Sequence, residues 1–462
     1  MLKIHSSLTK QKEIFKPLKP GHVGLYVCGM TVYDLCHIGH ARTVVAFDTI
    51  VRYLRYRNYE VQYVRNITDI DDKIITRAQE NKEDFHALTA RYIAAMEEDF
   101  ATLGAIPPNQ APRATETIEG IIALIQKLEQ KGFAYKADNG DVYYEVSKFA
   151  DYGKLSHRDM KESTQAGARV AIDEAKKDPL DFVLWKAAKA GEPAWDSPWG
   201  SGRPGWHIEC SAMSIECLGE QFDIHGGGFD LLFPHHENEI AQSEAVTGKQ
   251  FVNTWIHVGF VQINKEKMSK SLGNFFTIRD VLAEYRPEVV RYFLVASHYR
   301  SPINYSTESL TTAEGALERF YISLRGLPTN VAEVDQDFEA RFIEAMDDDF
   351  NTPIAIAVLF DLAREINRCR ETEPTKAAGL AALLRRLGSV LGILQDDPDV
   401  FLRREKAGQG DDVAKQIDAL IAARNEARTS KDWKRADEVR AELTRLNVVI
   451  EDTPIGTIWR RS

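Results

Sequence analysis

The fold of this 462-residue chain is decided by the stretch Gly24-Leu25-Tyr26-Val27-Cys28 and by the string His37-Ile38-Gly39-His40 that follows it. The stretch predicts a short apolar strand, and a helical pattern runs from about Ala41 to Arg57. A second strand is predicted at Val61-Gln62-Tyr63-Val64-Arg65. This order predicts a right-handed parallel crossover, with a ligand site at the carboxyl ends of the strands.

The double-histidine string lies at the start of the crossover helix, where unpaired N–H groups and the helix dipole favour phosphate. The imidazoles of His37 and His40 can hydrogen-bond phosphate oxygens, and Gly39 leaves room for a nucleotide. A pair of helix-capping histidines would explain this string equally well if it stood alone.

A second string, Lys267-Met268-Ser269-Lys270-Ser271, follows about 230 residues later. Lys267 and Lys270 can bring cations to the β- and γ-phosphates from a mobile loop at 264–273, and Mg²⁺ would share that charge. A solvated surface loop would explain this string alone. Both strings together, in this order, predict a site where a carboxylate attacks the α-phosphate of ATP.

Composition and length limit the class of protein. The net charge of −11 argues against a bulk electrostatic nucleic-acid binder, and five scattered cysteines argue against a disulfide framework. No apolar run approaches the roughly 18 residues that span a bilayer, and the N-terminal residues lack a signal peptide's apolar stretch. We expect a soluble, cytoplasmic protein of two to four domains with no membrane partner.

The predicted fold class is α/β, with three domains. A Rossmann-like parallel-sheet catalytic domain is expected at 1–310, with an insertion at about 81–206, and its second half resumes at the strand Phe222-Asp223-Ile224-His225-Gly226. After about Thr311 the pattern is helical only, which predicts an all-helical domain at 311–407. A small C-terminal α/β unit is expected at 413–462.

A metal site is predicted around Phe233-Pro234-His235-His236-Glu237-Asn238-Glu239. If a helix starts after Pro234, His235 and Glu239 share one face, and Cys28 and Cys210 can complete a tetrahedral set. Two thiolates, an imidazole and a carboxylate suit zinc. A buried thiol pair beside a helical His–Glu contact would explain the same spacing. His207 and His236 are candidate outer partners of the ligands, and Cys36, Cys217 and Cys369 are expected to be packing residues.

At this point the chain resembles the class I aminoacyl-tRNA synthetases, and within them the cysteinyl-tRNA synthetase family. The resemblance covers essentially the whole chain. It is carried by the two signature strings and by four further segments: Tyr26 to Asp34, Asn66 to Lys73, Gly205 to Cys210, and Pro234 to Glu239.

The resemblance implies a ligase of protein biosynthesis that activates L-cysteine with ATP and transfers it to the 3′ end of tRNA(Cys). It also implies one zinc ion per chain, held by Cys28, Cys210, His235 and Glu239, that binds the substrate thiolate. Cysteine and serine differ little in shape, so a metal that prefers sulfur supplies the discrimination.

The same resemblance implies the remaining roles. Trp206 and Thr68 would line the amino-acid pocket, and Lys270 would be the main cation of the lysine loop. Residues expected to contact the adenylate are Gly29, Thr31, His225 and Asp230. The helical domain would carry the tRNA stem, the C-terminal unit would read the anticodon, and the protein would be a monomer. Candidate phosphate contacts in the C-terminal unit are Arg424, Arg428, Lys431, Lys434 and Arg435.

Two alternatives stay open. A related cysteine ligase that acts on an amino sugar would share the catalytic core and the zinc site, but would resemble a truncated synthetase. A non-catalytic zinc protein that binds RNA would have no use for the histidine pair and the lysine loop together.

Overall fold

The computed structural model describes residues 1–158, 175–263, 266–267, 275–328, 331–332, 336–403, 412–453 and 456–461. The chain divides into two compact units. The first unit contains Met1–Ser306 and Ile343–Ala355, and the second contains Thr307–Phe342 and Ile356–Ser462. Lys270 and most of the predicted lysine loop lie outside the described residues.

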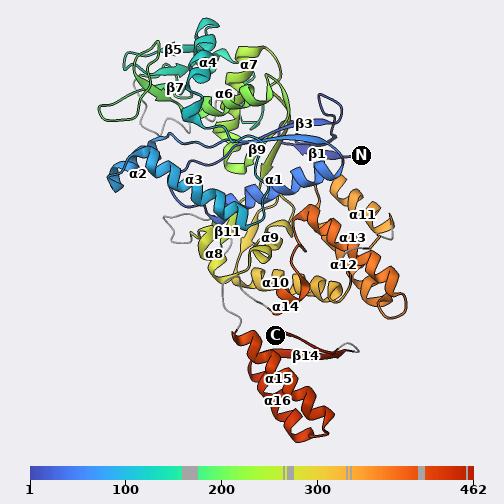
Figure 1. The fold of residues 1–462 in the computed structure, drawn as a ribbon. Helices are drawn as coiled ribbons and strands as arrows, with labels where there is room; N and C mark the ends of the chain where they lie inside the picture. Colours follow the sequence, from blue (N-terminus) through green and yellow to red (C-terminus); the bar gives the residue numbers. More distant parts are fainter. Residues whose placement is uncertain are drawn as a thin grey trace. The chain divides into compact units, whose positions relative to one another are not determined.

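The first unit is built on a four-stranded parallel sheet in the order β10-β9-β3-β4. Its strands are β3 (His22–Val27), β4 (Glu60–Arg65), β9 (Phe222–Gly228) and β10 (Val252–Val258). Strand β3 lies inside this sheet, between β4 and β9. Figure 1 labels β3 and its neighbour β9 above helix α1. The predicted parallel crossover from β3 to β4 is therefore present.

Helix α1 (Ile38–Tyr56) makes that crossover, and it begins three residues before the predicted Ala41. His37 is the residue that caps it, because its side chain accepts hydrogen bonds from the first backbone N–H groups. The helix packs closely against β9: a Cβ atom at Gly226 would lie 2.1 Å from the ring of Phe47. Glycine is thus required where α1 crosses the strand.

The chain between the two halves of the sheet contains helices and a second sheet. Helices α2 (Asp72–Asn81), α3 (Phe85–Thr102) and α4 (Ile118–Gln130) come first. An antiparallel sheet follows, made of β5 (Ala134–Lys136), β6 (Val142–Tyr144), β7 (Phe182–Ala187) and β8 (Gly202–Pro204). Helices α6 (Trp206–Leu218) and α7 (Glu237–Thr247) then bring the chain back beside the main sheet, and α4, α6 and α7 share a buried core with the second sheet.

The remaining elements of the first unit flank the main sheet. They are the hairpin β1 (Lys3–Ser6) and β2 (Gln11–Ile14), the small sheet of β11 (Val261–Ile263), β12 (Glu266–Lys267) and β13 (Ile303–Tyr305), and helices α8 (Ile278–Glu284) and α9 (Pro287–Val295). Strand β11 follows β10 directly, so the chain leaves the main sheet at its carboxyl edge and enters the lysine string.

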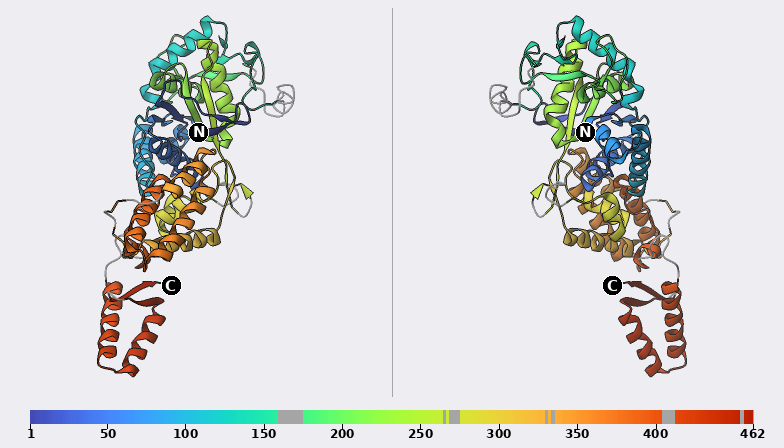
Figure 2. Two further views of the ribbon diagram at one scale, coloured as in Figure 1. Left: turned by 90° about the vertical axis from the view of Figure 1, so that its right-hand side faces the viewer. Right: turned by 90° about the vertical axis from the view of Figure 1, so that its left-hand side faces the viewer.

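The second unit is helical except for its last hairpin. Its helices are α10 (Thr307–Leu324), α11 (Gln336–Asp347), α12 (Thr352–Cys369), α13 (Pro374–Leu391), α14 (Pro398–Arg403), α15 (Asp412–Thr429) and α16 (Trp433–Arg445). The final elements are β14 (Val448–Thr453) and β15 (Gly456–Arg461), which pair antiparallel. Helices α15 and α16 lie side by side in both views of Figure 2.

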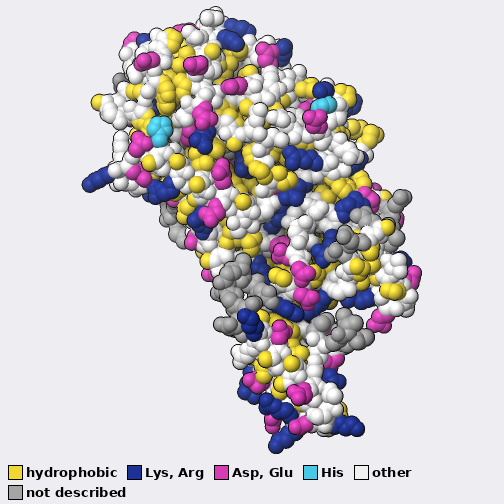
Figure 3. All heavy atoms as spheres, viewed as in Figure 1, with side chains coloured by type: hydrophobic (Ala, Val, Ile, Leu, Met, Phe, Trp, Pro, Cys, Tyr) yellow, Lys and Arg dark blue, Asp and Glu magenta, His cyan; other side chains and the backbone are white. Residues whose placement is uncertain are grey.

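Charged side chains of both signs are interspersed over the face of the molecule in Figure 3. In the part of the chain that the structure describes, no helix combines the length and the apolar character needed to cross a membrane.

Candidate active site and metal centre

A cavity of about 410 Å³ opens at the carboxyl edge of the main sheet. It has the size of a small-molecule site. Its walls come from the end of β3, the start of α1, the segment after β9 and the connection between β10 and β11. Eight of the predicted site residues line it: Cys28, Gly29, Thr31, His37, Gly39, His40, Trp206 and Asp230.

The two signature histidines form a reciprocal cap at the start of α1. Nδ1 of His37 accepts hydrogen bonds from the backbone N–H groups of Gly39 (3.1 Å) and His40 (3.3 Å). Nδ1 of His40 accepts from the backbone N–H of His37 at 3.3 Å, and the two rings stack with centroids 3.6 Å apart. An imidazole nitrogen that accepts a hydrogen bond carries no proton, so both rings are neutral and hold their proton on Nε2. The cap thereby makes each ring a donor through Nε2–H at the wall of the cavity.

The segment that follows the lysine string returns to the same histidines. Thr277 pairs with His37 in an antiparallel bridge, and the N–H of Ile38 donates to the carbonyl of Phe276 at 3.2 Å. The ring of Phe275 meets that of His37 edge-on at 5.2 Å. Before the string, the backbone of Lys267 in β12 lies opposite Gln262 of β11. The described residues that follow the lysine string therefore lie beside His37.

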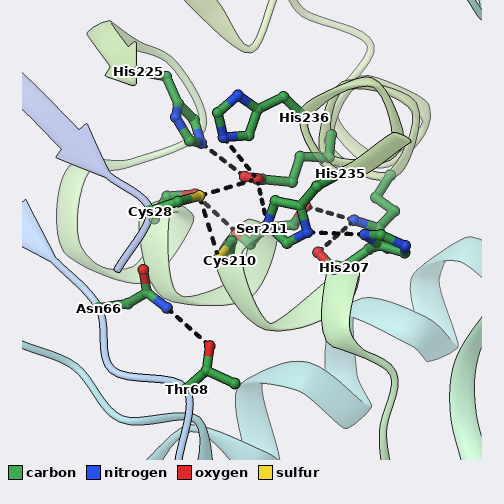
Figure 4. A network of polar contacts seen from close by, with 12 residues as sticks. Cys28, Asn66, Thr68, His207, Cys210, Ser211, His225, His235 and His236 are labelled. Atoms are coloured by element: carbon green, nitrogen blue, oxygen red, sulfur yellow. Dashed lines mark hydrogen bonds and ion pairs between the residues drawn. The ribbon is translucent and has the colours of Figure 1, made fainter. Parts of the chain in front are cut away.

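The four predicted metal ligands come together below the cavity (Figure 4). The sulfur atoms of Cys28 and Cys210 lie 3.6 Å apart, and the Cys28 sulfur lies 3.4 Å from Oε1 of Glu239. Nε2 of His235 lies 3.1 Å from the same oxygen. All four side chains are buried, and only Cys28 also lines the cavity.

These distances match the edges of a zinc tetrahedron. Zn–S, Zn–N and Zn–O bonds of ordinary length give S–S, S–O and N–O separations of about 3.8, 3.5 and 3.3 Å. The structure has 3.6, 3.4 and 3.1 Å. A simple buried thiol pair beside a helical His–Glu contact would not require the thiols and the carboxylate to meet at such separations. The donor set therefore fits a zinc ion.

The pKa values in the cluster favour a thiolate at Cys210, a carboxylate at Glu239 and a protonated imidazole at His235. The hydrogen bond from Cys28 lowers the pKa of the Cys210 thiol to about 6, whereas burial raises the pKa of Cys28. Burial acts against the charges of His235 and Glu239, but their mutual contact and the neighbouring Cys210 and His225 outweigh it. The pKa of His235 rises to about 10 and that of Glu239 falls to about 2. A cation would replace the proton that His235 holds.

His225 holds the second oxygen of Glu239. Its Nε2 lies 2.8 Å from Oε2 of Glu239, and its ring stacks on Trp255 with centroids 4.4 Å apart. The side chain is fully buried and, among the described residues, is not part of the cavity wall. This position favours a role in orienting the carboxylate over the expected contact with the adenylate.

A second set of four residues also lies close enough to share a cation: Cys28, His225, His236 and Glu239. The Nδ1 atom of His236 is already engaged, because it lies 2.8 Å from Nε2 of His257. Nδ1 of His257 in turn lies 2.7 Å from the hydroxyl of Ser7. Burial lowers the pKa of His236 and brings that of His257 to about 3, so both rings are neutral. The first set, which contains the thiols of both Cys28 and Cys210, fits zinc better than this second set, because thiolate ligands favour softer metals.

His207 and Trp206 cover the outer side of His235. Nδ1 of His207 lies 2.9 Å from Nδ1 of His235, and the indole of Trp206 lies over the His235 ring with centroids 4.3 Å apart. Trp206 is 39% exposed, which places it between the metal cluster and the opening of the cavity. The predicted outer partners His207 and His236 both contact the cluster.

Gly29 and Thr68 have structural partners. A Cβ atom at Gly29 would lie 1.8 Å from the carbonyl oxygen of Asn66, and the N–H of Gly29 donates to the Asn66 side chain at 2.8 Å. Thr68 bridges to Thr31 and is 2% exposed (its hydroxyl lies beside the Asn66 amide in Figure 4). Within the described residues Thr68 is not part of the cavity wall. These contacts join the ends of β3 and β4 beneath the site.

Several residues around the site were missed by the sequence reasoning. Arg65 and Lys73 line the cavity, and the Lys73 ammonium lies 5.4 Å from the centre of the Tyr33 ring. His257 lies on the same face of its strand as Trp255, and this period of two is a signal that could have found it. Nothing in the local pattern marks Ser7.

The family comparisons cover nearly the whole chain. Residues 14–315 match the family described as tRNA synthetases class I (C) catalytic domain. Residues 341–395 match the DALR domain, and residues 410–460 match the cysteinyl-tRNA ligase anticodon binding domain. The fold also resembles solved synthetases. A methionyl-tRNA synthetase of Mycobacterium tuberculosis in complex with methionyl-adenylate is 15% identical, with 87% of this chain and 94% of that chain covered and a TM-score of 0.57.

The fold and the catalytic-domain match define a class I aminoacyl-tRNA synthetase. A cysteine–tRNA ligase of Thioalkalivibrio sulfidiphilus is 62% identical over 462 residues, with 100% of both chains covered. One from Methylococcus capsulatus is 60% identical over 466 residues, again with 100% of both chains covered. The chain belongs to the cysteine–tRNA ligase family, which confirms the resemblance, the fold class and the enzyme class predicted from the sequence.

Proposed function

We propose that the chain activates L-cysteine with ATP to cysteinyl-adenylate and transfers the cysteinyl group to the 3′ end of tRNA(Cys), with an active-site zinc ion that binds the substrate thiolate. The observation that carries this proposal is the position of Cys28. Its thiol belongs to the four-ligand cluster and also lines the cavity that begins at His37 and His40. The thiol-selective group and the nucleotide site therefore share one wall.

The residues that would hold zinc are Cys28, Cys210, His235 and Glu239. When bound, the ion supplies a soft Lewis acid that prefers a thiolate to a hydroxyl. His225 fixes one oxygen of Glu239, and His207 fixes the orientation of His235. Trp206 covers this side of the cavity, where its ring can pack on the small side chain of the substrate cysteine.

The nucleotide would lie along the start of α1. His37 and His40 donate through Nε2–H, Gly39 leaves space beside them, and Thr31 and Asp230 are within the same wall. We propose that Lys267 and Lys270 reach the outer phosphates together with Mg²⁺, since the chain that follows their loop pairs with His37 at Thr277. Positioned donors that meet charge as it develops are the main source of rate in phosphoryl-type transfer.

The second unit would bind tRNA. Of the three predicted domains, 1–310 would be catalytic, 311–407 would carry the tRNA stem and 413–462 would read the anticodon. In the C-terminal unit, Arg424 and Arg428 both bind Asp452, and the Arg424 guanidinium makes two hydrogen bonds of 2.9 Å to it. Arg424 is therefore a weaker candidate for a phosphate contact than the sequence indicated. Lys431, Lys434 and Arg435 remain exposed candidates.

ATP–pyrophosphate exchange tests the adenylate step, and it should appear with cysteine and be absent with serine. Equal exchange with both amino acids would contradict selection by zinc. Charging of tRNA(Cys), with an amino sugar as the competing acceptor, separates the proposal from the amino-sugar ligase. The match of residues 410–460 to an anticodon binding domain supports tRNA as the acceptor. A protein that bound zinc and RNA but catalysed no exchange would match the non-catalytic alternative.

A further inference from the structure

The turn between α11 and α12 carries three consecutive aspartates, and each one binds a different segment of the first unit. Asp347 binds Arg57 just after α1, and Asp348 binds Lys12 of β2 with 2.6 Å between the charged atoms. Asp349 binds the loop that joins α9 to β13. The turn is thus attached at several points.

Asp349 is the most deeply placed of the three, with no exposed surface. Its Oδ1 accepts hydrogen bonds from the backbone N–H of His5 at 2.9 Å and from the hydroxyl of Tyr299 at 2.7 Å. Its Oδ2 accepts from Nε of Arg300 at 2.8 Å. A buried carboxylate needs such a set of donors to offset its lost hydration. All of these donors belong to residues 1–306 of the first unit, so the Asp349 carboxylate links this turn to two other segments of that unit.

The backbone of the turn is strained. Asp349 has a φ of +63° and Phe350 a φ of +53°, in the left-handed region that a bulky side chain rarely adopts. The ring of Phe350 is buried against Tyr53 and Tyr299, with centroid distances of 6.1 and 6.4 Å. Such strain persists only where the surrounding contacts fix the conformation, and it concentrates at functional positions.

The turn belongs to a short stretch of the first unit that interrupts the second unit in sequence. The chain enters the first unit at Ile343 and leaves it at Ala355, while the bodies of α11 and α12 belong to the second unit. The match to the DALR domain, at 341–395, begins just before this turn. Residues 343–355 are therefore a part of the first unit that continues directly into helices of the second.

The loop that Asp349 binds also contacts the nucleotide site. Arg42 of α1, five positions after His37, donates to the carbonyls of His298 at 2.7 Å and Ser297 at 3.4 Å. On the other side of the loop, the N–H of Gly259 donates to the carbonyl of Tyr299 at 2.9 Å, and Gly259 lines the cavity. One short loop therefore joins Asp349, the signature helix and the cavity wall.

We propose that Asp349 is a positioning residue for transfer to tRNA, because it fixes the loop at 298–301 to the turn that carries the tRNA-binding helices. This inference rests on the proposed function. The lining of the cavity belongs to the first unit, and the contacts of Arg42 and Gly259 with the loop do not involve Asp349. Transfer also needs the tRNA to be held in register with the cavity, so the loss of this contact affects transfer more than activation.

The test is the Asp349→Asn variant of the full chain. Asparagine tolerates the left-handed backbone and keeps one oxygen for His5 and Tyr299, but its amide nitrogen cannot accept from Arg300. We expect kcat/KM for charging of tRNA(Cys) to fall by about tenfold or more, and cysteine-dependent exchange to stay within about twofold of the wild type. An unchanged ratio of charging to exchange, with both retained or both reduced in parallel, would overturn the proposal.

A matched control is Asp181→Asn, since Asp181 is also buried and accepts from the Tyr135 hydroxyl at 2.7 Å and the Val146 N–H at 2.9 Å. It should keep the wild-type ratio of charging to exchange even if its stability falls. Equal changes of the ratio in both variants would overturn the assignment.

Arg300→Gln removes the same contact from the 38% exposed partner and provides the test if Asp349→Asn does not fold. The double variant should lose no more charging activity than the more impaired of the two single variants, because both substitutions remove the same contact. Wild-type protein without cysteine-dependent exchange would refute the proposed function, and this inference with it.

Discussion

Glu237 anchors the start of the metal-binding helix, and its replacement by glutamine should weaken both the fold of the first unit and its hold on zinc. The side chain is 1% exposed and lies between His235 and Glu239 in sequence. Its Oε1 accepts from the N–H groups of Gly153 at 3.0 Å and Leu155 at 3.2 Å, and its Oε2 accepts from the N–H of Ser156 at 2.8 Å. One carboxylate thus fixes a whole turn of the insertion against α7.

The magnitude follows from those contacts. Glutamine keeps an oxygen for Gly153 and Leu155 but turns an N–H toward the N–H of Ser156. A hydrogen bond to a charged group contributes about 1.5–3 kcal/mol, and the two retained bonds lose their charge. We expect the free energy of unfolding of the first unit to fall by about 2–4 kcal/mol, which lowers its thermal midpoint by about 5 °C.

Calorimetry of the zinc-loaded protein measures the midpoint, and titration with a chelator measures zinc retention. A loosened start of α7 should make zinc loss about tenfold easier, as for other residues that orient metal ligands. Glu220→Gln is the control, because Glu220 is exposed and pairs only with Lys249 at the surface. If Glu237→Gln and Glu220→Gln behaved alike in both measurements, the reasoning about the anchored turn would be wrong.

Three further predictions concern the cluster, the signature helix and the partly buried ion pair of Asp347 with Arg57. Cys210→Ser should lower the zinc content measured by elemental analysis, and unchanged zinc would exclude this thiol as a ligand. His37→Asn should keep the helix cap but reduce the exchange rate by about 10²-fold, whereas His37→Ala should also lose about 1 kcal/mol of stability; near-normal exchange in either would contradict the donor role. Burial alone would raise the pKa of Asp347, but Arg57 and Tyr53 outweigh it and lower the pKa. Asp347→Asn should therefore be less stable than the wild type at neutral pH, with the gap closing below about pH 4 in urea titrations; a constant gap would refute this ion pair.

The sequence predicted the site best at positions where the chemistry or size of one residue type is required. The strand before Cys28, the glycine beside His37 and the thiol–imidazole–carboxylate set are of this kind, and the structure brings these segments together. Helix α1 begins earlier than its apolar pattern indicates, because its first turn is set by the cap of His37 and not by burial.

Local patterns could not show what depends on distant partners. The strands β5 and β8 have three residues each, which is too short for an alternating pattern to show in the sequence. The same limit applies to His225. The resemblance implied a contact with the adenylate, which stays a prediction, while the partner that His225 meets, Glu239, is placed by the later helix α7.

The order of the strands explains why the thiol–imidazole–carboxylate cluster and the cavity beside His37 lie together. The chain passes from β3 to β4 on one side, and the later strands β9 and β10 extend the sheet on the other. The carboxyl ends of β3 and β9 therefore meet where the order of the strands reverses, which is where open α/β sheets bind ligands. The end of β3 provides Cys28 and leads to His37, and the end of β9 leads through Asp230 to His235 and Glu239. A residue of the metal cluster can line the cavity only where the carboxyl ends of β3 and β9 meet. Because Cys28 alone does so, substitution of this residue should disturb zinc binding and the nucleotide wall together, whereas changes at Cys210 should act on zinc alone.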